Sequence, residues 1–128
     1  MPQAPKLRII PLGGVDEIGK NMTAFEYEDD ILIVDCGSIF PKEDMLGIDL
    51  VIPDVSYLVA KKKNVRAYLL THGHEDHIGA TPYILKQVPA PLYGTKLTLA
   101  LVDLKLKEYR VPGIPMQVVS PRDEVRIG

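Results

Sequence analysis

Residues 71–79 read Thr-His-Gly-His-Glu-Asp-His-Ile-Gly and contain all three histidines of the chain. In an extended segment, side chains two positions apart point to the same side, so we expect His72 and His74 to hold one cation together. Asp76 and His77 follow where the chain must turn, and they can help to hold a second cation. Imidazole and carboxylate donors suit zinc or a similar divalent ion. The segment therefore predicts a metal site.

The flanks of this segment predict rigid supports for the ligands. Residues 65–71 form a short apolar run with β-branched and aromatic members, which is typical of a buried strand, expected at 66–71. Apolar residues recur after the histidines, and they indicate a helix near 77–88 with one face on a core. A lone histidine is usually a surface or core residue, but chance does not readily place every histidine of a chain beside a carboxylate. The metal site is therefore the preferred interpretation.

The remaining pattern predicts an α/β fold without internal repeats. Asp54 is expected to cap a short helix that ends at the lysines 61–63, and Thr95 a helix that ends near Tyr109. Residues 36–53 form a long irregular stretch. Further strands are expected at 7–12, 22–27, 31–35, 91–94, 116–119 and 124–127.

Composition limits the functions that this chain can have. The 128 residues include 46% hydrophobic and 25% charged ones, which is ordinary for one globular domain or part of one. A net charge of −2 does not encode a broad basic face for nucleic acid. A single cysteine excludes an internal disulfide and fits a reducing compartment. Because the sequence has no apolar signal core and no run long enough to span a membrane, we expect a cytoplasmic protein.

The string His72-x-His74-x-Asp76-His77 at the end of a strand resembles the signature of the metallo-β-lactamase superfamily of metallohydrolases. Other segments are similar to the start of the bacterial ribonuclease J family, which belongs to the β-CASP group. The resemblance runs from about Leu7 to the last residue. It is carried by residues 11–21, 35–37, 40–41, 46–54, 72–79, 91–94 and 97–101.

This resemblance implies an αββα sandwich, of which residues 1–128 would form only the N-terminal part. The β-CASP insertion and the C-terminal parts would be absent. It also implies a ribonuclease of RNA processing and decay that degrades 5′-monophosphorylated RNA 5′→3′, cleaves endonucleolytically and assembles into homodimers or homotetramers. Two divalent ions, zinc or else manganese, would be its cofactors. In the family the remaining ligands lie beyond the position of Gly128, so the chain alone is expected to be inactive.

The resemblance assigns a role to each residue of the site. His72, His74, Asp76 and His77 would be metal ligands, and Asp76 would also orient the attacking water. Cations that acidify this water would promote its attack on the scissile phosphorus. Asp35, at the end of a strand, would orient the ligand loop from behind, although it can also be a simple turn residue.

Other polar residues receive structural interpretations. Cys36 is expected to be a small buried hydrophobe rather than a thiolate ligand. The glycine-containing loop 13–20 does not match a Walker phosphate loop, and a contact of Lys20 with RNA phosphate is the weaker interpretation. Glu75 is expected to be a solvated or structural carboxylate, and the lysines 61–63 are expected to be a solvated helix end. Asp49 and Asp54 are expected to be turn and cap residues rather than ligands.

Two alternative functions stay open. The first is a thioester or lactam hydrolase on the same scaffold. The second is a non-catalytic fragment that folds, or associates with copies of itself, without metal. The sequence does not identify the residues that would contact RNA.

Overall fold

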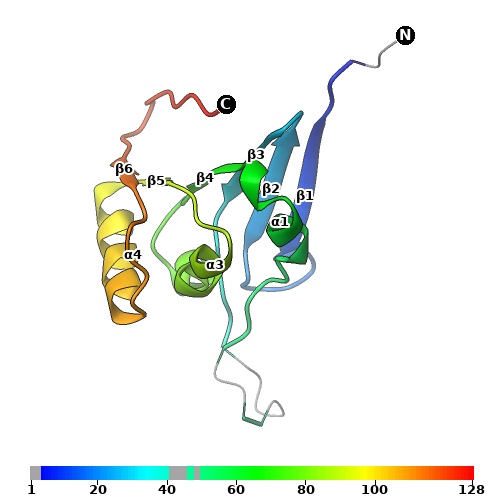
Figure 1. Cartoon of the computed structure of the whole chain (residues 1–128). Coiled ribbons are helices and arrows are strands. Elements are labelled where there is room, and N and C mark those ends of the chain that lie inside the picture. The colour runs from blue at the N-terminus through cyan, green and yellow to red at the C-terminus, as the bar shows by residue number, and fades with distance from the viewer. Residues whose placement is uncertain (1–3, 41–45, 48–49) are drawn as a thin grey trace.

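The strands of the chain form one mixed sheet in the same order as they occur in the sequence (Figure 1). The computed structural model describes residues 4–40, 46–47 and 50–128, so Asp49 lies outside the described residues. Strands β1 (Leu7–Gly13), β2 (Met22–Tyr27) and β3 (Asp30–Val34) are antiparallel. Strands β4 (Val65–Leu69), β5 (Leu92–Gly94) and β6 (Met116–Val118) continue the sheet in parallel to β3.

Helices connect the parallel strands. They are α1 (Ser56–Ala60), α2 (Glu75–Ile78), α3 (Thr81–Gln87) and α4 (Lys96–Glu108), with a 3₁₀ turn at Lys62–Asn64. Because crossovers between parallel strands are right-handed and the strand order never reverses, α1, α3 and α4 lie on one face of the sheet. Leu58, Ile84 and Val102 of these helices are fully buried in one cluster with Ile33 and Tyr68 of the strands. The hydrophobic core therefore lies between these helices and the sheet.

Alternation along β2 explains why the antiparallel half has a defined face. Met22, Ala24 and Glu26 are buried, whereas the residues between them are only half-buried. In a strand successive side chains point to opposite faces, so this register fixes which side faces the helices. Two large side chains of β1, Leu7 and Ile9, are 58% and 60% exposed. Apolar surface therefore remains uncovered at this edge of the sheet.

The helix expected at 77–88 is two helices. α2 ends at Ile78 and α3 begins at Thr81, with Pro82 in its first turn. A proline lacks the N–H that would continue a preceding helix and is well accommodated in the first turn of a new one. A side chain at Gly79 would also place its Cβ 1.9 Å from the Ser38 hydroxyl. Two short helices therefore take the place of one continuous helix.

Both predicted capping residues lie at helix starts. Thr95 is the N-cap of α4, and its hydroxyl accepts a hydrogen bond from the Thr98 N–H. Asp54 stands one residue before the N-cap Val55 of α1, and its carboxylate accepts from the N–H and hydroxyl of Ser56 at 2.9 and 2.6 Å. These hydrogen bonds hold the pKa of Asp54 below its ordinary value. Both residues thus tie up groups at a helix N-terminus.

The strand expected at 124–127 is wrong. Residues 124–128 have no regular secondary structure, and the side chains of 120–126 are exposed. A strand needs a neighbour to pair with its N–H and C=O groups, and among the described residues β6 is the last strand of the sheet. None of the described helices is both long and apolar enough to cross a bilayer.

The lysines at the end of α1 are not all solvated, which corrects the sequence-based expectation. The Lys61 ammonium lies 3.1 Å from the buried Glu26 carboxylate, and the Tyr57 hydroxyl donates to the same carboxylate at 2.5 and 2.8 Å. Arg8 adds a looser ion pair at 3.6 Å. The Tyr57 hydrogen bond, followed by the two cations, holds the pKa of Glu26 below its ordinary value although burial opposes this. A buried carboxylate is thereby kept charged.

Replacing Tyr57 with phenylalanine is expected to lower the free energy of unfolding by about 1–2 kcal/mol at neutral pH, because a buried carboxylate loses a donor. The folded Glu26 is more acidic than the unfolded one. Its contribution is therefore complete above the ordinary pKa of 4.5 and is lost as the pH falls through the lowered folded value. Urea unfolding at neutral pH and near pH 3 measures this effect, with the exposed Tyr27→Phe as control. A difference between Tyr57→Phe and the parent that widens in acid would contradict the assignment.

Candidate metal centre

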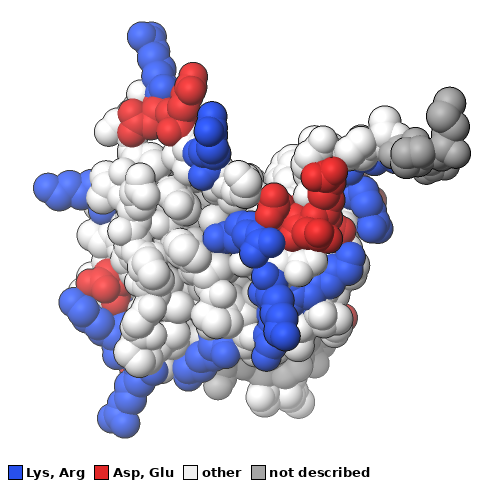
Figure 2. Space-filling view, turned by 45° about the horizontal axis from the view of Figure 1, so that its top comes forward, with Lys and Arg blue, Asp and Glu red and all other residues white. Residues whose placement is uncertain are grey.

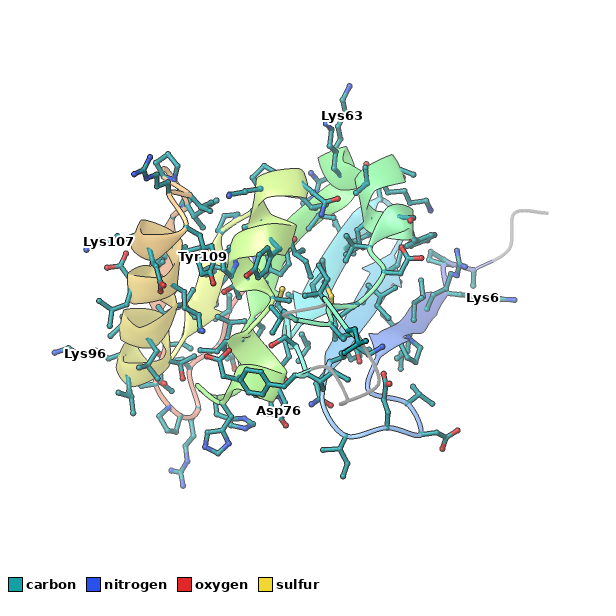
Figure 3. The ribbon with its side chains drawn as sticks, turned by 90° about the horizontal axis from the view of Figure 1, so that it is seen from below. Lys6, Lys63, Asp76, Lys96, Lys107 and Tyr109 are labelled. Atoms are coloured by element: carbon teal, nitrogen blue, oxygen red, sulfur yellow. The ribbon has the colours of Figure 1, made fainter. Side chains whose placement is uncertain are left out.

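The ligand loop joins β4 to the short helix α2. His74 is the N-cap of α2 in an extended conformation, so Asp76 and His77 belong to the single turn of this helix. One donor atom from each of His72, Asp76 and His77 lies within 4.8 Å of the others. In Figure 3, Asp76 lies at the short helix near one edge of the view, far from Lys63 at the opposite edge. The cluster therefore occupies one end of the molecule.

The three imidazole rings lie next to one another. The ring centroids of His72 and His77 are 4.0 Å apart, and those of His72 and His74 are 4.8 Å apart. His74 nevertheless lies outside the group that brings His72, Asp76 and His77 within reach of one ion. All four predicted ligands are thus neighbours. Their division between two cations stays a prediction.

Asp35 supports this cluster from the end of β3. Its carboxylate accepts hydrogen bonds from the Thr71 N–H at 2.8 Å and from the Thr71 hydroxyl at 2.9 and 3.0 Å. The same carboxylate lies 2.7 Å from Nδ1 of His77. Because a carboxylate only accepts, Nδ1 carries the hydrogen in this pair. Asp35 also adopts a positive φ of 64°, so it turns the chain at the same time.

The backbone after Asp35 runs directly beside α2. The Cys36 N–H donates to the His77 carbonyl at 2.8 Å, and the Ser38 N–H donates to the Glu75 carbonyl at 3.1 Å. A Cβ on Gly37 would lie 1.7 Å from the Asp76 carbonyl oxygen. Only glycine permits this close approach of two backbones. The backbone at the end of β3 therefore fixes the position of the ligand helix α2.

Asn21 also contacts the ligand helix, a role that the sequence analysis did not predict. Its N–H and its side-chain Nδ2 each donate to the Asp76 carbonyl at 3.0 Å. Nδ2 lies 3.4 Å from Nε2 of His77. The one available signal was its position at the end of a loop containing Gly13, Gly14 and Gly19. Such a loop permits a close backbone approach.

Charged side chains beside the cluster are largely paired. Lys20 lies 3.4 Å from Glu17, whose pKa is lowered by the Gly14 N–H and then by this lysine. Glu75 pairs with Lys105 of α4, so it acts as a structural carboxylate. Figure 2 shows Lys and Arg side chains spread around the face in view, with acidic side chains beside some of them. A contact of Lys20 with RNA phosphate stays untested.

Cys36 is fully buried next to Asp35. Burial, and then the Asp35 charge, raise the pKa of its thiol far above the ordinary value. A thiol held neutral in this way is a packing residue rather than a metal ligand. This agrees with the sequence-based interpretation.

A cavity of about 270 Å³ opens beside the cluster. Asp76 lies on its wall together with Ile18 and Phe40, whose side chains are 92% and 74% exposed. The chemistry of the donors fits a divalent cation, since imidazole nitrogens and a carboxylate converge on one partly solvated point. The site thus has both ligands and open space next to them.

Residues 15–123 of this chain match the metallo-beta-lactamase superfamily. The chain belongs to this superfamily. The metallo-beta-lactamase domain is 46% identical to ribonuclease J of Thermus thermophilus over 95% of this chain and 22% of that protein. It is 54% identical to ribonuclease J2 of Bacillus subtilis over 80% of this chain and 19% of that protein. The chain spans about a fifth of the length of these curated relatives.

A solved structure shares the fold of this metallo-beta-lactamase domain. A protein of unknown function from Enterococcus faecalis superposes with a TM-score of 0.68 at 19% identity, over 98% of this chain and 36% of that one. The α/β fold with its mixed sheet is therefore confirmed as a metallo-beta-lactamase fold, and the resemblance to ribonuclease J is confirmed at the level of sequence.

Proposed function

We propose that this chain supplies the metal centre of a ribonuclease that hydrolyses RNA phosphodiesters. The observation that carries the proposal is the convergence of His72, Asp76 and His77 in a chain 46% identical to a ribonuclease J over nearly its whole length. Because the chain spans about a fifth of that relative's length, we assign the activity to a polypeptide as long as the relatives.

The residues present fit two divalent cations, zinc or else manganese. His72 and His74 would hold one, and Asp76 and His77 would help to hold the second. When bound, such cations stabilise negative charge on phosphoryl oxygens and make water more acidic. The resemblance to ribonuclease J implies further ligands for these cations, among them another carboxylate.

The chain's own side chains prepare the site. Asp35 holds the Nδ1 hydrogen of His77, so that Nε2 presents its lone pair to the cluster. Thr71 is held by the same carboxylate, which fixes the start of the ligand loop. The Asp76 carboxylate is 40% exposed and can accept a hydrogen bond from the attacking water and so orient it.

The relatives' names support RNA as the substrate, and the finer features follow from the resemblance. We propose 5′-monophosphorylated RNA as substrate, 5′→3′ exonuclease and endonuclease activity in RNA processing and decay, and assembly into homodimers or homotetramers. We propose a cytoplasmic location, supported by the single buried cysteine. No residue of this chain is assigned to the 5′-phosphate.

An RNA cleavage assay tests the proposal. It uses the longest natural polypeptide that contains this sequence. With zinc or manganese, a 5′-monophosphorylated oligonucleotide is expected to be degraded from its 5′ end. His72→Ala is expected to slow this reaction by about 100-fold or more, because a ligand is lost. Gel electrophoresis of end-labelled RNA measures the rate, and a thioester and a β-lactam run in parallel. Intact RNA together with hydrolysed thioester or lactam would favour the alternative hydrolase.

A non-catalytic, self-associating chain is the other alternative, and the exposed Leu7 and Ile9 favour it over a well-covered monomer. Light scattering after size exclusion gives the oligomeric state. Metal analysis of the purified chain, with His72→Ala as control, then distinguishes a metal-binding chain from a non-catalytic one that only associates. A chain that associates but takes up no more metal than this variant would support the non-catalytic alternative.

A further inference from the structure

We infer that the Asn21 side chain is a positioning residue for the metal centre. It holds the backbone of Asp76 and the metal-facing nitrogen of His77 in one place. This inference rests on the metal site of the proposed function but not on ribonuclease activity. Asn21 is distant in sequence from the ligands and comes from the loop that precedes β2.

The orientation of the Asn21 amide is fixed by its partners. One of its terminal atoms lies 3.0 Å from the Asp76 carbonyl oxygen, which can only accept. The atom at that distance must therefore be the NH₂ group and not the amide oxygen. This group has two hydrogens, and one is used here.

The second hydrogen points to His77. The NH₂ group lies 3.4 Å from Nε2, while Nδ1 of the same ring donates to Asp35. A neutral imidazole with its hydrogen on Nδ1 has an unshared pair on Nε2, and this pair accepts from Asn21. The ring is thus held at both nitrogens, by a carboxylate on one side and an amide on the other. The single lone pair on Nε2 that accepts from Asn21 is the same pair that a cation would take.

A cation at Nε2 would replace the weaker of the two amide hydrogen bonds. The bond to the Asp76 carbonyl can persist, so Asn21 would keep the first turn of α2 in place while His77 changes partner. A ligand that is already oriented loses less conformational freedom when the ion binds. Residues that hydrogen-bond to a metal ligand and orient it typically contribute about 10–100-fold to metal affinity.

Substitution of Asn21 removes only this side-chain contribution. The Asn21 N–H still donates to the Asp76 carbonyl, and the Gly37 N–H still donates to the Asn21 carbonyl at 2.9 Å. These backbone bonds tie the loop, the end of β3 and the ligand helix together in any variant. The fold is therefore expected to tolerate alanine at this position.

Zinc titration calorimetry and NMR of the histidine rings test the inference on the chain itself. Asn21→Ala is expected to bind Zn²⁺ about 10-fold or more weakly. In the metal-free chain, the ¹⁵N signal of His77 Nε2 is expected to shift, since its hydrogen-bond donor is gone. Asn64→Ala, which changes the chain's other asparagine, is expected to leave both readouts unchanged.

A second variant distinguishes the loss of the NH₂ donor from a folding defect. Asn21→Asp keeps the size of the side chain but replaces the NH₂ donor with an acceptor, and it is expected to shift the same Nε2 signal. Unchanged His77 signals in both variants, or an unchanged zinc affinity in Asn21→Ala, would overturn the inference. If the parent chain bound no zinc, the metal centre itself would be wrong, whereas the NMR signals of the metal-free chain would still test the Asn21 contact.

Discussion

His77→Ala is expected to weaken zinc binding by more than about 100-fold, a larger loss than removing a residue that merely orients a ligand. His77 combines two functions, because Nδ1 is held by Asp35 while Nε2 faces the cluster. Alanine removes a donor and leaves the Asp35 carboxylate without its partner at 2.7 Å. Titration calorimetry with Zn²⁺ measures the affinity, and thermal unfolding shows whether the variant remains folded.

His74→Ala is the informative comparison. His74 lies outside the group formed by His72, Asp76 and His77, so its loss is expected to weaken the binding of an ion held by that group less than the loss of His77 does. If both ions bind as the sequence predicts, His72→Ala and His74→Ala should instead weaken the same binding event. A folded His77→Ala chain with the parent's affinity would rule out His77 as a ligand.

Gly37→Ala is expected to destabilise the chain by about 3 kcal/mol and to weaken zinc binding as well. The added Cβ would meet the Asp76 carbonyl carbon at 2.4 Å and its oxygen at 1.7 Å. Both are backbone atoms, so no flexible side-chain end can move aside. The end of β3 and the ligand helix must therefore separate. Urea unfolding and zinc titration measure the two effects.

Gly94→Ala is the matched control. Gly94 is also buried and has no positive φ, but a Cβ there would have its nearest neighbour at 3.4 Å, which is ordinary contact. Its effect is expected to stay within about 1 kcal/mol. Equal losses for the two variants would mean that the contact with Asp76 does not set the requirement for glycine at position 37.

The sequence could predict the ligands because they are close together along the chain. His72, His74, Asp76 and His77 lie in one short segment, so strand periodicity and donor chemistry were sufficient to single them out as candidate ligands. The contacts of Asn21 and Gly37 with Asp76 join residues that are far apart in sequence, and only the fold brings them together. A single sequence contains no direct signal for such contacts.

The errors in secondary structure have similar causes. The apolar pattern after His77 did not reveal the break before α3, because the spacing of the apolar residues continues across Gly79 and Ala80, where one helix ends and the next begins. The β-branched pattern at 124–127 predicts a strand, but pairing with a neighbour decides whether a strand forms. The other strands and α4 agree with their predicted positions within about two residues.

Each strand of the sheet is hydrogen-bonded to the one synthesised just before it. None of the described strands has to wait for a distant part of the chain, so the sheet can grow in the order in which residues leave the ribosome. Asn21, Gly37 and the histidine segment have all been made by residue 77. The parts of the metal centre that this chain contributes are therefore available for assembly well before synthesis reaches β6.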